Sequence, residues 1–186
     1  AFGEALKNNS SLRTKIKLIT KCGIKMMSPN RPDHYIKSYD SSATHIKASV
    51  ENSLKNFNTD YIDTLLIHRP DVLMNVQEIA EAITTLKQEG KVKYFGVSNF
   101  TKNQIELLNQ YIKVEQHQVE ISTTNLDAFH NGILEQAQLN NIKIQSWSPL
   151  GNGLLDGQTE MHKRIHIFNI SFFVRYFILI IKLFYD

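Results

Sequence analysis

Hydrophobic and polar positions alternate along the first 150 residues in a way that predicts strands and helices in turn. Short apolar runs rich in β-branched residues predict five strands, at Ile16–Thr20, Tyr61–Ile67, Tyr94–Val97, Gln118–Ile121 and Ile142–Trp147. Apolar residues three or four positions apart predict a helix in each gap, and residues 1–7 predict a further helix at the start. This order predicts an α/β fold with parallel strands joined by right-handed crossovers.

Local signals place the helix ends. Ser42 is expected to cap the helix after the first strand, and Thr101 with Gln104 forms a capping-box pattern before a later helix. The second long helix is expected to stop at Gly90. The segment 23–40 is expected to be a loop. A doubly wound sheet and a β/α barrel both fit this alternation, so periodicity leaves the two architectures open.

Composition narrows the class of protein. The chain has 186 residues, of which 42% are hydrophobic and 21% charged, as in an ordinary globular domain. A single Cys excludes an internal disulfide, so we expect a cytoplasmic protein, and residues 1–7 do not resemble a secretory leader. A complete eight-unit β/α barrel needs roughly 200 residues or more, and this chain is shorter.

The net charge of +3 lies entirely in residues 162–186, which hold four of the 21 basic and one of the 18 acidic residues. The remaining sequence has 17 of each and is neutral. The body therefore has no charge signature of a nucleic-acid-binding protein or of binding to an anionic membrane. We expect neither partner for it.

Polar side chains follow or end four of the five predicted strands, and the fourth strand carries Gln118 itself. They are Lys21, His68, the pair Ser98-Asn99, Gln118, and the run from Trp147 to Gly151. In parallel α/β proteins ligands bind at the edge where the carboxyl ends of the strands meet. The pattern therefore predicts a small-molecule site.

Each of these residues also has a structural interpretation. Lys21 alone is typical of a solvated strand end, and position alone makes His68 as consistent with a hydrogen-bonded structural histidine as with a catalytic one. Ser98 and Asn99 could cap the following helix. Gln118 could face the edge of the sheet.

Trp147 could also have a structural role in the core, with its N–H bonded to a partner there. The sequence gives little support for a metal site or a serine nucleophile. Before residue 160 there is no His-x-x-x-His or Cys-x-x-Cys spacing, so no metal site is expected. A Gly-x-Ser-x-Gly nucleophile elbow is also lacking.

At these residues the chain resembles the aldo-keto reductase family. The segments that carry the resemblance occur in the family's order over roughly residues 1–155, and the chain is similar to bacterial oxidoreductases of that family. The matching segments are Thr20-Lys21, Asp63-Thr64-Leu65-Leu66-Ile67-His68-Arg69-Pro70-Asp71, Gly90-Lys91-Val92-Lys93-Tyr94-Phe95-Gly96-Val97-Ser98-Asn99-Phe100, Gln118-Val119-Glu120 and Trp147-Ser148-Pro149-Leu150-Gly151.

The resemblance implies a TIM-type (β/α)8 barrel, here about five of the eight βα units. It further implies NADP(H) as cofactor, no metal, and reduction of a small-molecule aldehyde or ketone to an alcohol. Lys21 and His68 look like the catalytic lysine and histidine. The remaining matches look like cofactor-binding residues: Ser98, Asn99 and Gln118 at the nicotinamide carboxamide, Trp147 on the nicotinamide ring, and Ser148, Leu150 and Gly151 at the pyrophosphate.

In this family a tyrosine protonates the carbonyl oxygen, a lysine cation lowers the pKa of that tyrosine, and an aspartate pairs with the lysine. The family's tyrosine and aspartate lie upstream of the segment that matches Ala1-Phe2-Gly3, so the resemblance implies a truncated copy that does not turn over carbonyl substrates alone. The alternatives are a non-catalytic pseudo-enzyme, or a fragment that binds a partner through its open barrel edges.

Residues 156–186 form an atypical hydrophobic and basic tail, separate from the expected barrel portion 1–155. The stretch 162–186 lacks Gly, Pro, Ala, Thr, Glu and Gln and is rich in residues with AT-rich codons, which favours a frameshift product. A membrane anchor over 165–185 is the less favoured alternative because Arg175 would lie mid-span, and an amphipathic helix is a third.

Overall fold

The computed structural model describes residues 2–29, 32–122 and 124–151. The chain divides into two compact units, residues 1–117 and 118–186. The expected tail, 156–186, lies outside the described residues.

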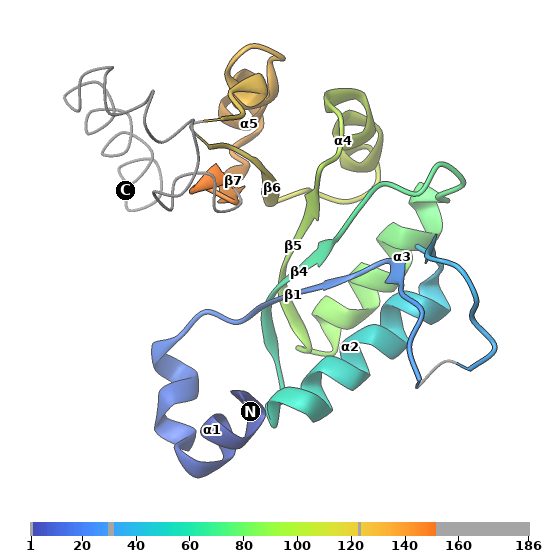
Figure 1. The fold of residues 1–186 in the computed structure, drawn as a ribbon, viewed down its shortest axis with the longest axis vertical. Helices are drawn as coiled ribbons and strands as arrows, with labels where there is room; N and C mark the ends of the chain where they lie inside the picture. The colour runs from blue at the N-terminus through green and yellow to red at the C-terminus, as the bar shows by residue number, and fades with distance from the viewer. Residues whose placement is uncertain (1, 30–31, 123, 152–186) are drawn as a thin grey trace, which may run out of the picture. The chain divides into compact units, whose positions relative to one another are not determined.

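The first unit contains the long helices of the described chain and most of its strands (Figure 1). Its elements in order are α1 (Phe2–Asn8), a 3-10 turn (Ser10–Lys15), β1 (Ile19–Cys22), β2 (Ile24–Lys25), β3 (Ser38–Tyr39), α2 (Ala43–Phe57), β4 (Ile62–Ile67), α3 (Val76–Gln88), β5 (Val92–Ser98), α4 (Lys102–Asn109) and the start of β6 (Gln116–Glu120).

The main sheet is parallel, as the sequence pattern predicts, and its strand order is β1-β4-β5-β6-β7. In the first unit, Thr20 of β1 lies beside Leu65 of β4, and Leu65 lies beside Phe95 of β5. All six residues of β4 are buried, because this strand has neighbours on both sides and helices on one face. Helices α2 and α3 run side by side along the sheet (Figure 1).

The predicted helix caps are confirmed. The Ser42 hydroxyl accepts a hydrogen bond from the His45 N–H at the start of α2. Thr101 and Gln104 form the expected reciprocal capping box at the start of α4, so Thr101, rather than Ser98 or Asn99, caps that helix.

The predicted first strand is misplaced: it runs over Ile19–Cys22 rather than Ile16–Thr20. The reason is a side chain, because the Leu18 N–H donates to a carboxylate oxygen of Asp63 (3.0 Å) rather than to a neighbouring strand. The expected loop 23–40 also contains a short antiparallel pair, β2 with β3, that the sequence analysis did not predict. This hairpin is fixed to the end of β1 by the Asp40 N–H, which donates to the Gly23 carbonyl (3.1 Å).

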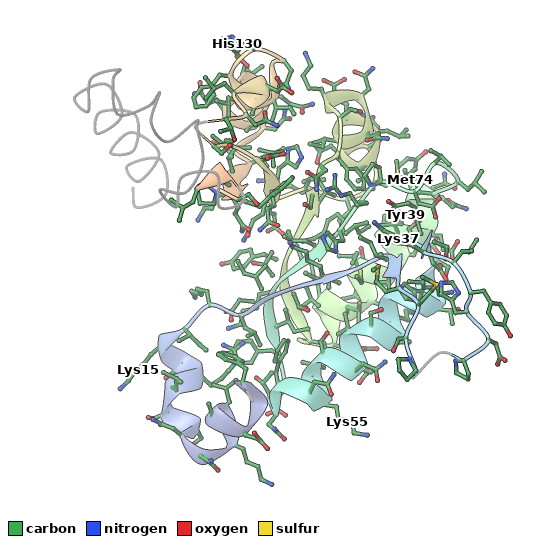
Figure 2. The ribbon with its side chains drawn as sticks, in the orientation of Figure 1. Lys15, Lys37, Tyr39, Lys55, Met74 and His130 are labelled. Atoms are coloured by element: carbon green, nitrogen blue, oxygen red, sulfur yellow. The ribbon has the colours of Figure 1, made fainter. Side chains whose placement is uncertain are left out.

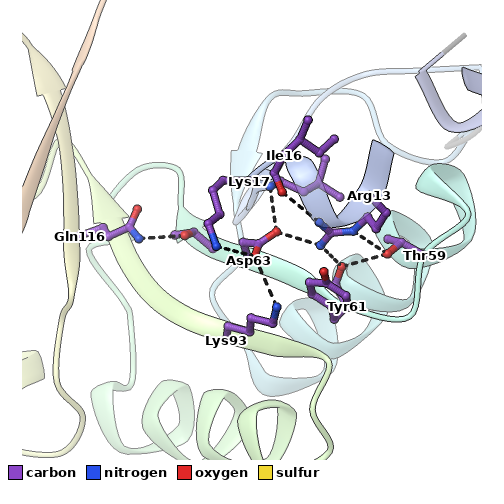
Figure 3. A network of polar contacts seen from close by, with 10 residues as sticks. Arg13, Ile16, Lys17, Thr59, Tyr61, Asp63, Lys93 and Gln116 are labelled. Carbon is purple, nitrogen blue, oxygen red and sulfur yellow. Dashed lines mark hydrogen bonds and ion pairs between the residues drawn. The ribbon is translucent and has the colours of Figure 1, made fainter. Parts of the chain in front are cut away.

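Asp63, near the N-terminal end of β4, lies at the centre of a polar network (Figure 3). Its side chain is 2% exposed and accepts a 2.8 Å hydrogen bond from the Arg13 guanidinium. Lys17 and Lys93 lie 3.8 and 3.6 Å from its other oxygen. Burial alone would raise the pKa of Asp63, but the hydrogen bonds from Leu18 and Arg13 and the charges of Arg13 and Lys93 lower it.

In the second unit, β6 continues to Glu120 and is followed by a 3-10 turn (Asp127–Phe129), α5 (Ile133–Asn140) and β7 (Lys143–Trp147). Its small core is formed by Val119, Ile121 and Ala128, with Ile133 and Ile144 packed against them. The predicted fifth strand and the helix before it are confirmed to within a residue or two.

Candidate functional site

The register of the first unit brings Lys21, His68 and Ser98 to one end of its sheet. Lys21 of β1 lies beside Leu66 of β4, and Leu66 lies beside Gly96 of β5. Two residues further along, His68 follows β4 and Ser98 ends β5. Side chains two positions apart share a face of a strand, so all three residues belong to the same face.

The opposite face of β1 carries Thr20, whose hydroxyl contacts Ser53 of α2 (3.5 Å). Lys21 therefore lies on the face away from that helix. The His68 N–H donates to the Cys22 carbonyl at 2.9 Å and extends the ladder beyond β4. This bond fixes the backbone of His68 relative to β1.

Gly96 of β5 allows the Gln116 backbone and the Leu66 side chain to approach closely. A Cβ atom there would lie 2.3 Å from the Gln116 carbonyl oxygen and 2.7 Å from Leu66 Cδ2. Only glycine fits that close approach. This role of Gly96 was not predicted from the sequence, where the residue lies within the motif Gly90–Phe100.

His68 has a strongly positive surrounding. Its pKa is lowered first by burial and then by the charges of Lys21, Arg69 and Lys37. The pKa of Lys21 is lowered by burial and by Arg69. The imidazole is therefore neutral near pH 7, the form that can both donate and accept a hydrogen bond. Arg69 and Lys37 are members of this group that the sequence analysis did not propose.

Ser98 and Asn99 form a coupled pair at the end of β5. Ser98 is 1% exposed, and its hydroxyl accepts a 2.8 Å hydrogen bond from the Asn99 side-chain amide. Asn99 has a φ of 59°, a left-handed conformation that asparagine tolerates better than most residues. Their backbone thus turns sharply before α4 begins, and both polar groups stay at the strand end.

In the second unit, Gln118 is the most informative residue. Its side-chain N–H donates to the Gln145 side-chain oxygen at 3.2 Å. Its own oxygen, Oε1, is buried and has no hydrogen-bond partner among the described residues. A buried acceptor without a partner costs free energy, so it is suited to a ligand that carries an N–H donor. The carboxamide of a nicotinamide is such a donor, and Gln118 therefore fits the cofactor that the resemblance implies.

The turn after β7 holds the other predicted cofactor-binding residues of the second unit. Trp147 is half-buried, and Ser148 follows it with a φ of 49°. The Gly151 N–H donates to the Ser148 carbonyl at 2.8 Å, which closes a tight turn, and Leu150 is 58% exposed at its tip.

Two further findings concern titratable groups. Burial lowers the pKa of His117 to about 4, and its Nε2 has no partner among the described residues. Burial raises the pKa of the free Cys22 thiol to about 12, so this cysteine is a poor nucleophile.

Residues 2–29, 32–122 and 124–151 contain no cluster of three His, Cys, Asp or Glu side chains suited to a metal ion. Within the same residues no helix has the length and apolar character needed to cross a membrane.

Comparison with known proteins gives a consistent result. The sequence profile described as the aldo/keto reductase family matches residues 1–169. The chain is 46% identical over 167 residues to the uncharacterized oxidoreductase YcsN of Bacillus subtilis, covering 88% of this chain and 56% of that protein. It is 41% identical over 156 residues to the 6-dehydroglucose reductase of Agrobacterium fabrum, covering 83% of this chain and 52% of that protein.

A solved structure supports the same grouping. The glycerol dehydrogenase AKR11B4 from Gluconobacter oxydans superimposes with a TM-score of 0.76 at 26% sequence identity, covering 86% of this chain and 47% of that one. The chain thus spans about half the length of the relatives that it matches.

Proposed function

Because the chain belongs to the aldo/keto reductase family and its parallel sheet is part of that family's (β/α)8 barrel, we propose that it derives from an enzyme that reduces aldehydes or ketones to alcohols with NADP(H). The observation that carries the proposal is the placement of Lys21, His68 and Ser98 on one face at the carboxyl end of the sheet. That is where barrel enzymes bind their substrates.

The roles of the residues follow from their chemistry. The cofactor, when bound, supplies a hydride to the carbonyl carbon, and negative charge then develops on the carbonyl oxygen. Neutral His68 is suited to donate a hydrogen bond to that oxygen, and the Lys21 cation stabilises negative charge nearby and lowers the pKa of a neighbouring acid. Lys21 and His68 are thus the proposed catalytic residues.

The proposed cofactor contacts follow the resemblance. The Ser98–Asn99 pair and Gln118 would bind the carboxamide, and the unpaired Gln118 oxygen supports this role most directly. Trp147 would stack on the nicotinamide ring, since its indole is half-buried. Ser148, Leu150 and Gly151 would lie at the pyrophosphate, in the tight turn that follows β7.

We also propose that the chain as printed binds the cofactor without efficient turnover. None of Tyr35, Tyr39, Tyr61, Tyr94 and Tyr111 stands in the family's catalytic motif, and carbonyl reduction without a general acid is slower by about 10²–10⁴. A non-catalytic role as a pseudo-enzyme is the alternative. We keep a cytoplasmic location as a proposal, which the single free thiol supports.

The experiment uses the only tryptophan in the chain as a reporter. NADPH is titrated into the protein while Trp147 fluorescence is recorded, with NADH as the comparison. We expect saturable quenching by NADPH, weaker quenching in Gln118→Leu, and unchanged quenching in the control Gln138→Leu, which alters an exposed glutamine of α5. Absence of saturable quenching by either cofactor would contradict the proposal. The absorbance of NADPH with 4-nitrobenzaldehyde then measures turnover, which we expect to be slow.

A further inference from the structure

Gln145 holds the side chain of Gln118 from the neighbouring strand of the second unit. Gln118 belongs to β6 and Gln145 to β7, and these two strands are neighbours in the sheet. The Gln118 side-chain N–H donates to the Gln145 side-chain oxygen at 3.2 Å. Both residues are half-buried, so the Gln118 amide takes part of its hydrogen bonding from the protein rather than from solvent.

The two glutamines share one face of these strands with Trp147. The opposite face belongs to the small core, in which Val119 of β6 and Ile144 of β7 pack. Side chains alternate between the faces along a strand, so Gln118 and Gln145, each next to one of these core residues in the sequence, lie on the other face. Trp147 is two positions beyond Gln145 and therefore shares its face. Gln145 thus belongs to the same face as the proposed nicotinamide contacts of this unit.

The hydrogen bond to Gln145 decides which atom of the Gln118 amide is left for a ligand. A glutamine amide has an oxygen that only accepts hydrogen bonds and an NH2 group that only donates them. Because the Gln145 oxygen takes an N–H of Gln118, the buried atom left without a partner among the described residues is the Gln118 oxygen, Oε1. Without an acceptor at the position of Gln145, the amide could turn over and offer its NH2 group to the ligand instead.

We propose that Gln145 is a positioning residue: it orients the Gln118 amide so that the chain prefers a nicotinamide cofactor whose ring substituent carries an N–H donor. This inference rests on the proposed cofactor-binding function, because it explains how one contact of that site is set. A buried oxygen that meets a methyl group in place of an N–H loses its hydrogen bond and stays desolvated, which weakens binding by about 10-fold or more.

Two analogues of NADP+ test the required hydrogen-bond donor. In the acetylpyridine analogue a methyl group replaces the NH2 of the carboxamide, whereas the thionicotinamide analogue keeps the NH2 and carries sulfur in place of oxygen. Calorimetry on the full chain measures the affinity of each. We expect the acetylpyridine analogue to bind about 10-fold or more weakly than NADP+, and the thionicotinamide analogue to stay within about 3-fold of NADP+. Equal affinities for NADP+ and the acetylpyridine analogue would overturn the proposal.

Two substitutions then test whether this preference depends on Gln145. Gln145→Met nearly keeps the length of the side chain and removes the acceptor, so the preference for NADP+ over the acetylpyridine analogue should shrink to about 3-fold or less. Gln145→Glu keeps an acceptor, so it should retain the preference. The ratio of the two affinities is compared, so a change in overall affinity does not enter. Loss of the preference in both variants, or its retention in both, would overturn the proposal.

The matched control is Gln138→Met in α5. Ile133 and Leu134 of this helix pack against the core, on the face opposite to Gln145. Figure 2 shows His130, which precedes α5, at the edge of the second unit remote from β7. Gln138 is exposed, and we expect its substitution to leave all three affinities unchanged. Loss of the preference in this variant as well would refute the assignment to Gln145.

A measurement without cofactor separates this inference from the proposed function. NMR follows the exchange of the Gln118 side-chain N–H protons with water, and the variant Gln118→Leu identifies their signals. We expect slow exchange in the wild type and in Gln145→Glu, and exchange about 10-fold faster in Gln145→Met, because the hydrogen bond protects this N–H. Slow exchange without NADP+ binding would support the orientation of Gln118 and refute cofactor binding. Binding of NADP+ with equally fast exchange in all variants would refute the positioning role alone.

Discussion

At the N-terminal end of β4, Arg13, Lys17 and Lys93 surround the buried carboxylate of Asp63. At the C-terminal end of the same strand, Lys21, Lys37 and Arg69 act on an imidazole, His68, and every charge that acts on it is positive. Three cations thus lie around a buried carboxylate at the first end and act on an imidazole at the second. Removing the carboxylate partner of a buried cation strongly destabilises a fold, whereas a histidine whose pKa is lowered by burial and by nearby charges is typical of a functional site.

The largest expected effect is at Asp63. Asp63→Asn removes the charge that Arg13, Lys17 and Lys93 share and leaves Arg13 buried without its counter-ion. We expect the free energy of unfolding to fall by about 3–5 kcal/mol, measured by urea denaturation. Asp60→Asn, the same change at an exposed neighbour, should cost less than about 0.5 kcal/mol. Equal costs at the two positions would show that the network does not stabilise the fold.

Acid should destabilise the protein through His117, a histidine whose pKa burial alone lowers to about 4. An unfolded histidine titrates near pH 6.5, so between about pH 6.5 and 4 the unfolded state binds a proton that the folded state does not. Stability is complete above this window and falls by about 3 kcal/mol across it. His117→Leu should flatten the dependence of unfolding free energy on pH in this range, whereas a steep dependence that survives in this variant would contradict the assignment. The control His130→Gln, at an exposed position, should leave the curve unchanged.

A matched pair of lysines compares the two ends of β4 directly. Lys93 lies 3.6 Å from an Asp63 oxygen and 3.6 Å from the centre of the Tyr61 ring, so Lys93→Met should destabilise by about 0.5–1 kcal/mol. Lys37→Met removes a like charge from the His68 end and should be neutral or slightly stabilising in the same urea denaturation. Equal destabilisation by both would remove the distinction between the two ends.

The smallest expected effect is on the titration of His68. Arg69→Gln removes one of the charges that lower its pKa, so the pKa should rise towards the ordinary value. Two-dimensional NMR of the imidazole protons measures this, and the His117 titration in the same spectra should not move. If the pKa of His68 is unchanged, Arg69 does not act on it.

Most strands and helix starts could be predicted from the sequence because they follow from local patterns, whereas the choice between a doubly wound sheet and a barrel came from the family resemblance. The run Leu65-Leu66-Ile67 predicts a buried strand, and His68 must then lie at its end. Thr101 with Gln104 likewise predicted the start of α4. These features depend on residues that are neighbours in the chain.

The features that were missed depend on residues far apart in sequence. The Asp63 carboxylate, 45 positions away, accepts the hydrogen bond that the Leu18 N–H would otherwise donate to a neighbouring strand. The strand β1 therefore begins after Leu18. Lys37 acts on His68 because of the β2–β3 hairpin, which no periodic pattern in the sequence predicts. The roles of Gly96, which depends on the Gln116 backbone, and of His117 are equally invisible without the neighbouring strands.

The most direct test of the difference between the two ends of β4 is an amide NMR spectrum of the chain titrated with NADPH. The account predicts saturable shifts at His68, Ser98, Asn99 and Gln118 and none at Arg13 or Asp63. Shifts centred on Arg13 and Asp63, or no saturable shift anywhere, would contradict the claim that the carboxyl end of this sheet is the ligand-binding end.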